Sequence, residues 1–168
     1  MNTAEKFIRI LKKNQIDEVF IYPGGTIAPI INACEKFNVK IHTFKSEQGA
    51  GYAAIGAYKT TKKPQILMVT SGPGVTNSLT PLADAFYDSI PLFLVAGQIS
   101  TDELSKRKKV RQRGFQEVPT LNLVNKISKD QTLINNTHNF ERKIENLIEK
   151  SNSGRPGPIV IDFPMNIQ

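Results

Sequence analysis

Residues 66–77 have the sequence Ile-Leu-Met-Val-Thr-Ser-Gly-Pro-Gly-Val-Thr-Asn, and this stretch decides the fold class. Its first five residues are apolar or β-branched, which is typical of a buried strand. Gly72, Pro73 and Gly74 then interrupt the strand, and a helix is predicted over residues 76–87. A buried strand that turns through glycine into a helix is the repeating unit of a parallel α/β sheet.

The same alternation continues on both sides of this stretch. Further helices are predicted at residues 4–14, 27–37, 48–60, 119–125 and 140–150, and further strands at residues 19–22, 40–44, 92–96, 131–134 and 159–163. Thr3 is the expected N-cap of the first helix, and Asn14 is expected to close it. The pattern predicts one doubly wound α/β domain over residues 1–168. Its six-stranded, mostly parallel sheet would be covered by helices on both faces.

The composition is that of an ordinary folded domain. The chain has 168 residues, of which 39% are hydrophobic and 22% charged, and its formal net charge is +7. Such a chain can bury a core and is too apolar for intrinsic disorder. It lacks an apolar run of the roughly 18 residues that a membrane span needs, and its N-terminus lacks the apolar segment of a signal peptide. With Cys34 as the single cysteine, these features favour the cytoplasm and argue against a membrane protein.

Most of the net positive charge lies in one segment, residues 105–113, which holds six Lys and Arg residues and no acid. A solvated, mobile loop is the favoured interpretation, and an anion-binding loop is the second. A nucleic-acid contact is the least favoured, because no aromatic residue lies inside the run.

The residues that follow each strand are the candidate functional residues, because ligands of parallel α/β sheets bind beyond the carboxyl ends of the strands. Glu47 follows one such strand in the first turn of a predicted helix, with Ser46 as the expected N-cap. An acid there is commonly only a favourable partner of the helix dipole. The small residues at positions 49–54 nevertheless indicate close packing with little water, where a carboxylate can serve in proton transfer.

Several other chemistries lack their motif. The third glycine of a dinucleotide fingerprint is replaced by Asn77, and no P-loop sequence occurs. His42 and His138 are far apart in the sequence, so no metal site is expected. Cys34 lies in a predicted helix among apolar residues and is expected to be a small core residue.

Seven motifs at these positions occur together in one order. They are Tyr22-Pro23-Gly24-Gly25, Glu47-Gln48-Gly49-Ala50, residues 70–74 with Thr76-Asn77, Asp88-Ser89-Ile90-Pro91, Gly97-Gln98, Phe115-Gln116-Glu117, and residues 154–158 with Asp162 and Pro164. This set resembles the N-terminal pyrimidine-binding (PYR) domain of acetolactate (acetohydroxyacid) synthase and related thiamine diphosphate enzymes, and the resemblance covers essentially the whole chain.

The resemblance implies thiamine diphosphate as the cofactor and Glu47 as the catalytic residue. Its carboxylate would hydrogen-bond N1′ of the aminopyrimidine ring and favour the imino tautomer that removes the C2 proton of the thiazolium. The implied cofactor-binding residues are Tyr22, Pro23, Gly24, Gly25, Glu47, Pro73, Asn77 and Gln98. Gln98 is also an implied substrate contact, and the further substrate candidates are Phe115, Gln116, Arg111 and Arg113.

The implied activity is decarboxylation of a 2-oxo acid such as pyruvate, followed by ligation to a second carbonyl compound. The middle domain and the domain that binds diphosphate and Mg²⁺ would lie outside residues 1–168, because the chain lacks the Gly-Asp-Gly signature of the Mg²⁺ site. The PYR domain alone is therefore expected to be inactive. Its implied partners are a diphosphate-binding domain or subunit and a second copy of the chain, in a homodimer or larger assembly. The use of FAD stays open.

Two features depart from the acetolactate synthase pattern. Ser46 stands where histidine is common, and the 17 positions from Gln98 to Phe115 are more than that enzyme usually has. One alternative is the PYR subunit of a split 2-oxo acid decarboxylase that resembles sulfopyruvate decarboxylase. A second is a carboligase of surface-sugar biosynthesis, to which residues 110–117 are similar. A third is an inactive binding module that keeps the fold, against which the retained Glu47 argues.

Overall fold

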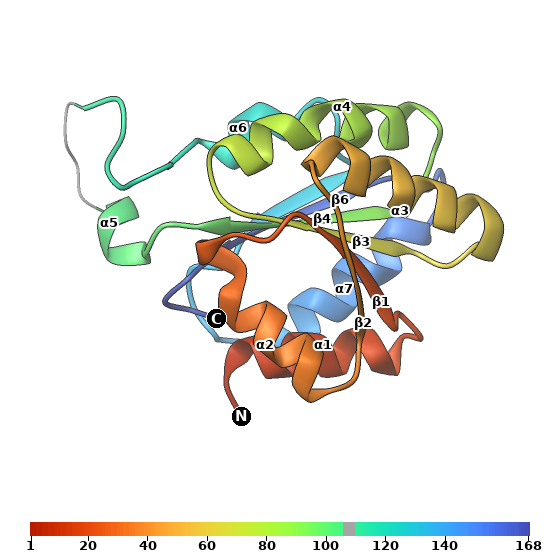
Figure 1. Ribbon diagram of the computed structural model, residues 1–168, viewed down its shortest axis with the longest axis horizontal. Coiled ribbons are helices and arrows are strands. Elements are labelled where there is room, and N and C mark those ends of the chain that lie inside the picture. Colours follow the sequence, from red (N-terminus) through yellow and green to blue (C-terminus); the bar gives the residue numbers. More distant parts are fainter. Residues whose placement is uncertain (106–109) are drawn as a thin grey trace.

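All the strand pairs of the sheet are parallel. The computed structural model describes residues 1–105 and 110–168, and its six strands follow the order β2-β1-β3-β4-β6-β5 (Figure 1). The strands are β1 (Glu18–Ile21), β2 (Lys40–Thr43), β3 (Gln65–Val69), β4 (Leu92–Gln98), β5 (Asp130–Leu133) and β6 (Ile159–Pro164). The predicted doubly wound α/β class is confirmed, and the sheet is parallel throughout.

Helices cover both faces of this sheet. Among the described residues the helices are α1 (Thr3–Lys13), α2 (Ala28–Lys36), α3 (Glu47–Thr61), α4 (Pro73–Tyr87), α5 (Thr101–Ser105), α6 (Thr120–Val124) and α7 (Phe140–Asn152), with a 3₁₀ turn, η1 (Gly25–Ile27). Helices α1, α2 and α7 lie on one face, and α3, α4 and α6 lie on the other (Figure 1). From β1 the chain continues to β2 on one side of the sheet, whereas β3 and the later strands lie on the other side. Ligand-binding loops are therefore expected at the carboxyl ends of β1 and β3.

The core forms two apolar clusters, one on each face of the sheet. Strands β3, β4 and β6 are buried along their whole length, as near-continuous apolar runs in a parallel sheet should be. The edge strands β2 and β5 are only partly buried. Cys34 is fully buried in the cluster beneath α2, which confirms it as a core residue.

Close packing between α3 and α4 explains the small residues of α3. A Cβ atom added at Gly51 would lie 2.5 Å from Cγ of Pro81 in α4. Alanine there would force the two helices apart, so the glycine permits their close approach. The predicted close packing of this helix is therefore confirmed.

The ends of some elements differ from the sequence-based predictions. The predicted N-cap Thr3 is wrong: Asn2 is the cap, because its Oδ1 accepts a hydrogen bond from Glu5 N at 2.9 Å. Helix α4 begins at Pro73, three residues before its predicted start, since proline suits a first helical position. The short α5 was not predicted. Within the predicted basic segment, residues 106–109 lie outside the described residues.

No helix among residues 1–105 and 110–168 is long and apolar enough to cross a membrane.

Candidate functional site

The loops after β1 and β3 interlock through Thr26. The hydroxyl groups of Thr26 and Thr70 share a hydrogen bond of 2.8 Å, and Ser71 N donates to Thr26 Oγ1 at 3.0 Å. Gly24 packs directly on Thr70, because an added Cβ would lie 2.4 Å from its Cβ atom. The backbone of the Gly24-Gly25 turn is therefore held at the carboxyl edge of the sheet. An added Cβ at Gly25 would meet nothing within 4 Å, so its backbone is open to an incoming group.

Glu47 is buried at the start of α3 with only 5% of its surface exposed. Ser46 is the N-cap as predicted, since its Oγ accepts from Gly49 N at 3.1 Å. Asn77 of α4 donates from Nδ2 to Oε2 of Glu47 at 3.1 Å. Within the described part of the chain, the other oxygen, Oε1, has no hydrogen-bond partner, and no basic side chain pairs with the carboxylate. The structure thus brings together two predicted site residues that lie 30 positions apart.

Gln98, at the end of β4, is turned into a buried polar network. Its Nε2 donates to Val118 O at 3.1 Å, to Asp162 Oδ2 at 3.2 Å and to Thr120 Oγ1 at 3.4 Å, while its Oε1 accepts from Ile99 N at 2.9 Å. All the polar atoms of the side chain are therefore engaged by protein. In this arrangement Gln98 holds the residues before α6 against the sheet.

Asp162 of β6 is the acid of this network, and its pKa is strongly raised. Burial raises its pKa from the ordinary 3.8 to about 7, against hydrogen bonds from Gln98 and Thr120 that act in the opposite direction. Its Oδ1 is buried without a partner. The side chain lines a cavity of about 150 Å³ that Arg113 also lines.

The segment that carries Phe115 and Gln116 packs against the turn after β3. A Cβ added at Gly72 would lie 2.6 Å from the backbone oxygen of Gln116, and Gly72 has a φ of +63°. Both observations explain why position 72 is a glycine, because the positive φ and the close contact each disfavour a side chain. Phe115 is 84% exposed beside this turn.

The predicted arginines differ in their surroundings. Arg113 is paired with Glu117, with its Nε 2.8 Å from Oε1 and its backbone N 2.6 Å from Oε2, and its Nη1 donates to Leu104 O. The hydrogen bond from Arg113 lowers the pKa of Glu117. Arg111 is exposed. Arg113 is thus occupied by an internal partner, whereas Arg111 faces solvent.

The predicted site residues of these loops differ in exposure. Tyr22, Pro23, Pro73 and Asn77 are exposed, and Gly24 is partly buried. Sequence reasoning missed Thr26 as the residue that joins the loops, and it missed the partnership of Gln98 with Asp162. A hydroxyl directly after Gly24-Gly25 is a local signal that could have indicated the role of Thr26. The contact between Gln98 and Asp162 has no local signal.

These residues suit the aminopyrimidine end of thiamine diphosphate. A ring nitrogen that carries a proton needs a buried acceptor, and the free Oε1 of Glu47 supplies one beside an open glycine backbone. Over the residues the structure describes, no group of three His, Cys, Asp or Glu side chains could hold a metal ion.

Comparison with known proteins gives a family and a set of relatives. The family model described as the thiamine pyrophosphate enzyme, N-terminal TPP binding domain matches residues 1–124. The chain is 37% identical over 168 residues, all of its length, to the acetolactate synthase isozyme 2 large subunit of Escherichia coli, and the match covers 30% of that protein. It is 35% identical over 164 residues (96% of its length) to the mitochondrial acetolactate synthase catalytic subunit of Saccharomyces cerevisiae, covering 23% of that protein. The chloroplastic acetolactate synthase of Arabidopsis thaliana is 34% identical over 166 residues, which are 98% of this chain and 24% of the relative. The chain thus spans between 23% and 30% of the length of these relatives.

Proposed function

Because the chain belongs to the family of N-terminal TPP-binding domains of thiamine pyrophosphate enzymes, we propose that it is the aminopyrimidine-binding domain of an acetolactate synthase-like enzyme. The whole enzyme would decarboxylate a 2-oxo acid such as pyruvate and ligate the product to a second carbonyl compound. The relatives reported above are all acetolactate synthases, which supports this activity over that of a split decarboxylase or a sugar carboligase.

The observation that carries the proposal is the buried carboxylate of Glu47 with one free oxygen. The chemistry that thiamine diphosphate supplies when bound is stabilisation of the carbanion left by decarboxylation. Glu47 would accept a hydrogen bond from the ring nitrogen N1′ and hold a proton there, in a position that excludes most water. A carboxylate in a low-dielectric site binds a proton-bearing nitrogen more strongly than one in water.

Asn77 would act as a positioning residue for Glu47. Its Nδ2 is a fixed donor to Oε2, so Oε1 is the oxygen left to meet the ring. The Gly24-Gly25 backbone, held by Thr26 and Thr70, would approach the cofactor without interference from side chains.

The other components of the site are proposed to come from outside this chain. A diphosphate-binding domain or subunit would supply the Mg²⁺ ligands, and the exposed Tyr22 and Phe115 would face it or the substrate. Arg111 is favoured over Arg113 as a contact for an anionic substrate, because Arg113 is already paired with Glu117. Association into a dimer or larger assembly remains part of the proposal. So does a cytoplasmic location, which differs from the mitochondrial and chloroplastic locations in the names of the yeast and Arabidopsis relatives.

The test is Glu47→Gln in the complete enzyme. The amide is nearly isosteric, so the fold should survive, whereas the loss of a positioned acid/base group should lower kcat by roughly 10²–10⁴-fold. Glu35→Gln, an exposed acid on α2, is the matched control and should keep full activity. Thermal melting of each variant separates a chemical effect from unfolding. If Glu47→Gln kept full turnover, Glu47 would have no catalytic role and would only be a favourable partner of the α3 dipole.

A further inference from the structure

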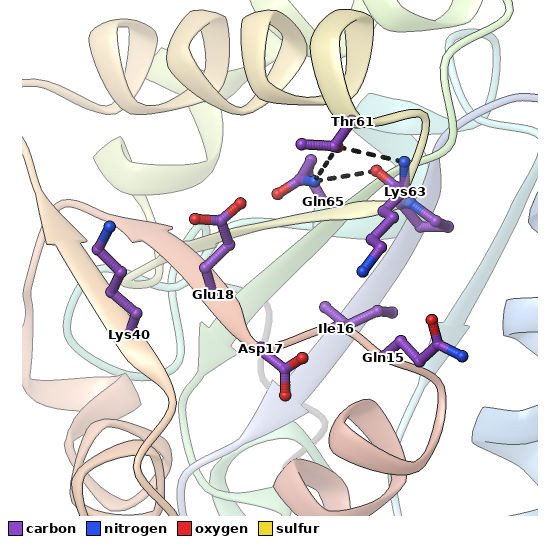
Figure 2. A pocket seen from close by; sticks show the side chains of 9 residues that line it. Gln15, Ile16, Asp17, Glu18, Lys40, Thr61, Lys63 and Gln65 are labelled. Carbon is purple, nitrogen blue, oxygen red and sulfur yellow. Dashed lines mark hydrogen bonds between the residues drawn. The ribbon is translucent and has the colours of Figure 1, made fainter.

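A second candidate site lies at the opposite edge of the sheet from Glu47. A cavity of about 310 Å³ opens at the amino ends of β1, β2 and β3, and Figure 2 shows the side chains that line it. The residues that matter for the argument are Ile16, Glu18, Lys40, Lys63 and Gln65. Ligands of α/β sheets usually bind at the carboxyl ends of the strands, so the proposed cofactor site does not explain polar groups here.

Gln65 is the buried polar residue of this cavity, with 2% of its surface exposed. Its Nε2 donates to Lys63 O at 3.0 Å and to Thr61 Oγ1 at 3.3 Å. The Lys63 carbonyl can only accept, so the amide cannot be reversed and the nitrogen must point that way. Its Oε1 is then left buried without a partner. Leaving such an acceptor unsatisfied is unfavourable, and the group needs a donor.

Glu18 faces the same space. In Figure 2 the carboxylate of Glu18 and the amide oxygen of Gln65 are turned toward one another across the cavity. His42 Nε2 lies 3.0 Å from Oε2 of Glu18, which leaves the second carboxylate oxygen available. Two facing acceptors, one of them charged, form a site for a donor that carries positive charge.

Two lysines lie at the sides of the cavity. Lys40 and Lys63 are both exposed, and within residues 1–105 and 110–168 neither ammonium group has an ion-pair or hydrogen-bond partner. Figure 2 shows them on either side of Glu18 and Gln65. With Glu18 and the exposed Asp17, which also lines the cavity, the rim carries two acids and two lysines, so a simple cation would leave the lysines unpaired. A molecule that also carries an anionic group would satisfy both parts of the cavity.

We propose that this cavity binds a small zwitterion that carries a primary ammonium and an anionic group. The ammonium would donate to Gln65 Oε1 and to the Glu18 carboxylate. The anionic group would pair with the ammonium of Lys40 or Lys63, and the carbon chain would lie against Ile16, which forms an apolar part of the wall. The site is independent of Glu47 and of the proposed enzyme activity.

Binding to the full chain would be measured by calorimetric titration and by NMR. The probes are glycine, β-alanine and γ-aminobutyrate, which are zwitterions of increasing length, with methylammonium and acetate as single-charge controls. At least one zwitterion should bind, and more tightly than either control. Glu18→Gln and Gln65→Met should each lower the affinity for that zwitterion about tenfold or more, as expected for the loss of a hydrogen bond to a charged group.

Two matched variants sharpen the test. Gln131→Met removes a buried, unpartnered amide oxygen on β5, away from the cavity, and should leave binding unchanged. The double variant Lys40→Met, Lys63→Met should weaken the binding of the zwitterion and leave the binding of methylammonium unchanged. Should Gln65→Met fail to fold, Glu18→Gln decides, because its side chain is about one-third exposed and the change conserves its shape.

Three outcomes would overturn the proposal. The first is that none of the zwitterions binds. The second is that methylammonium binds as tightly as they do, which would make this a cation site. The third is that acetate does so, which would make the lysines alone an anion site.

Discussion

Replacing the buried Asp162 by Asn should change how the stability of the protein depends on pH. Asp162 is 4% exposed, one of its carboxylate oxygens has no partner, and burial raises its pKa from 3.8 to about 7. In the folded protein the group therefore keeps its proton up to about pH 7, whereas in the unfolded chain it loses the proton near pH 3.8. Asparagine is neutral at all these pH values and has nearly the same shape.

The sign and size of the effect follow from proton binding. Between pH 3.8 and about 7 the unfolded state binds fewer protons at this position than the folded state, so the wild-type protein loses stability as the pH rises. The slope is about 1.4 kcal/mol per pH unit, and the shift of about three units makes the total about 4 kcal/mol. The stabilisation is fully present below pH 3.8 and is lost above about pH 7.

Asp162→Asn should keep the contact that matters and remove this dependence. The amide oxygen can accept from Gln98 Nε2 as Oδ2 does now at 3.2 Å, and the amide nitrogen replaces the unpartnered Oδ1. Urea unfolding of both proteins, followed by circular dichroism at several pH values between 4 and 8, measures the difference in unfolding free energy. We expect the unfolding free energy of the variant to increase steadily relative to that of the wild type as the pH rises to about 7. A difference that stays constant over this range would refute the argument that Asp162 is destabilised by burial of its charge.

Three further predictions concern single residues. Asn77→Ala should lower kcat of the complete enzyme by roughly 10–100-fold with an unchanged melting temperature, because Glu47 loses the donor that orients it; equal kcat values would remove Asn77 from the site. Gly97→Ala should destabilise the fold by about 1–3 kcal/mol, since the new Cβ would lie 2.1 Å from Thr26 Oγ1. In the same denaturation assay the control Gly56→Ala, which meets nothing within 4 Å in the middle of α3, should stabilise it by about 0.5–1 kcal/mol. Cys34 should resist alkylation in the native protein and react on unfolding, because burial raises the pKa of its thiol to about 12; rapid labelling of the folded chain by iodoacetamide would contradict this.

Much of the fold was predictable because its signals are local. Apolar and β-branched runs such as residues 66–69 define strands, and the Gly72-Pro73-Gly74 turn after them sets the change to a helix. The N-cap Ser46 and the position of Glu47 in the first turn of α3 depend on neighbouring residues only, and both were predicted. The N-cap of α1 was misplaced by one residue, because Asn2 and Thr3 are both good capping residues and sequence alone does not choose between them.

The sequence by itself therefore determined the parallel α/β class, the family resemblance and Glu47 as the candidate acid. Only the tertiary structure decided which side chains meet: Asn77 on Glu47, Asp162 on Gln98, Thr26 on Thr70, and Gln65 opposite Glu18. The physical reason is that each of these pairs joins residues from different elements, between 30 and 64 positions apart where hydrogen bonds connect them. Their distances are set by strand order and helix packing, and the burial that shifts the pKa of Asp162 or isolates the oxygen of Gln65 arises only when those layers close.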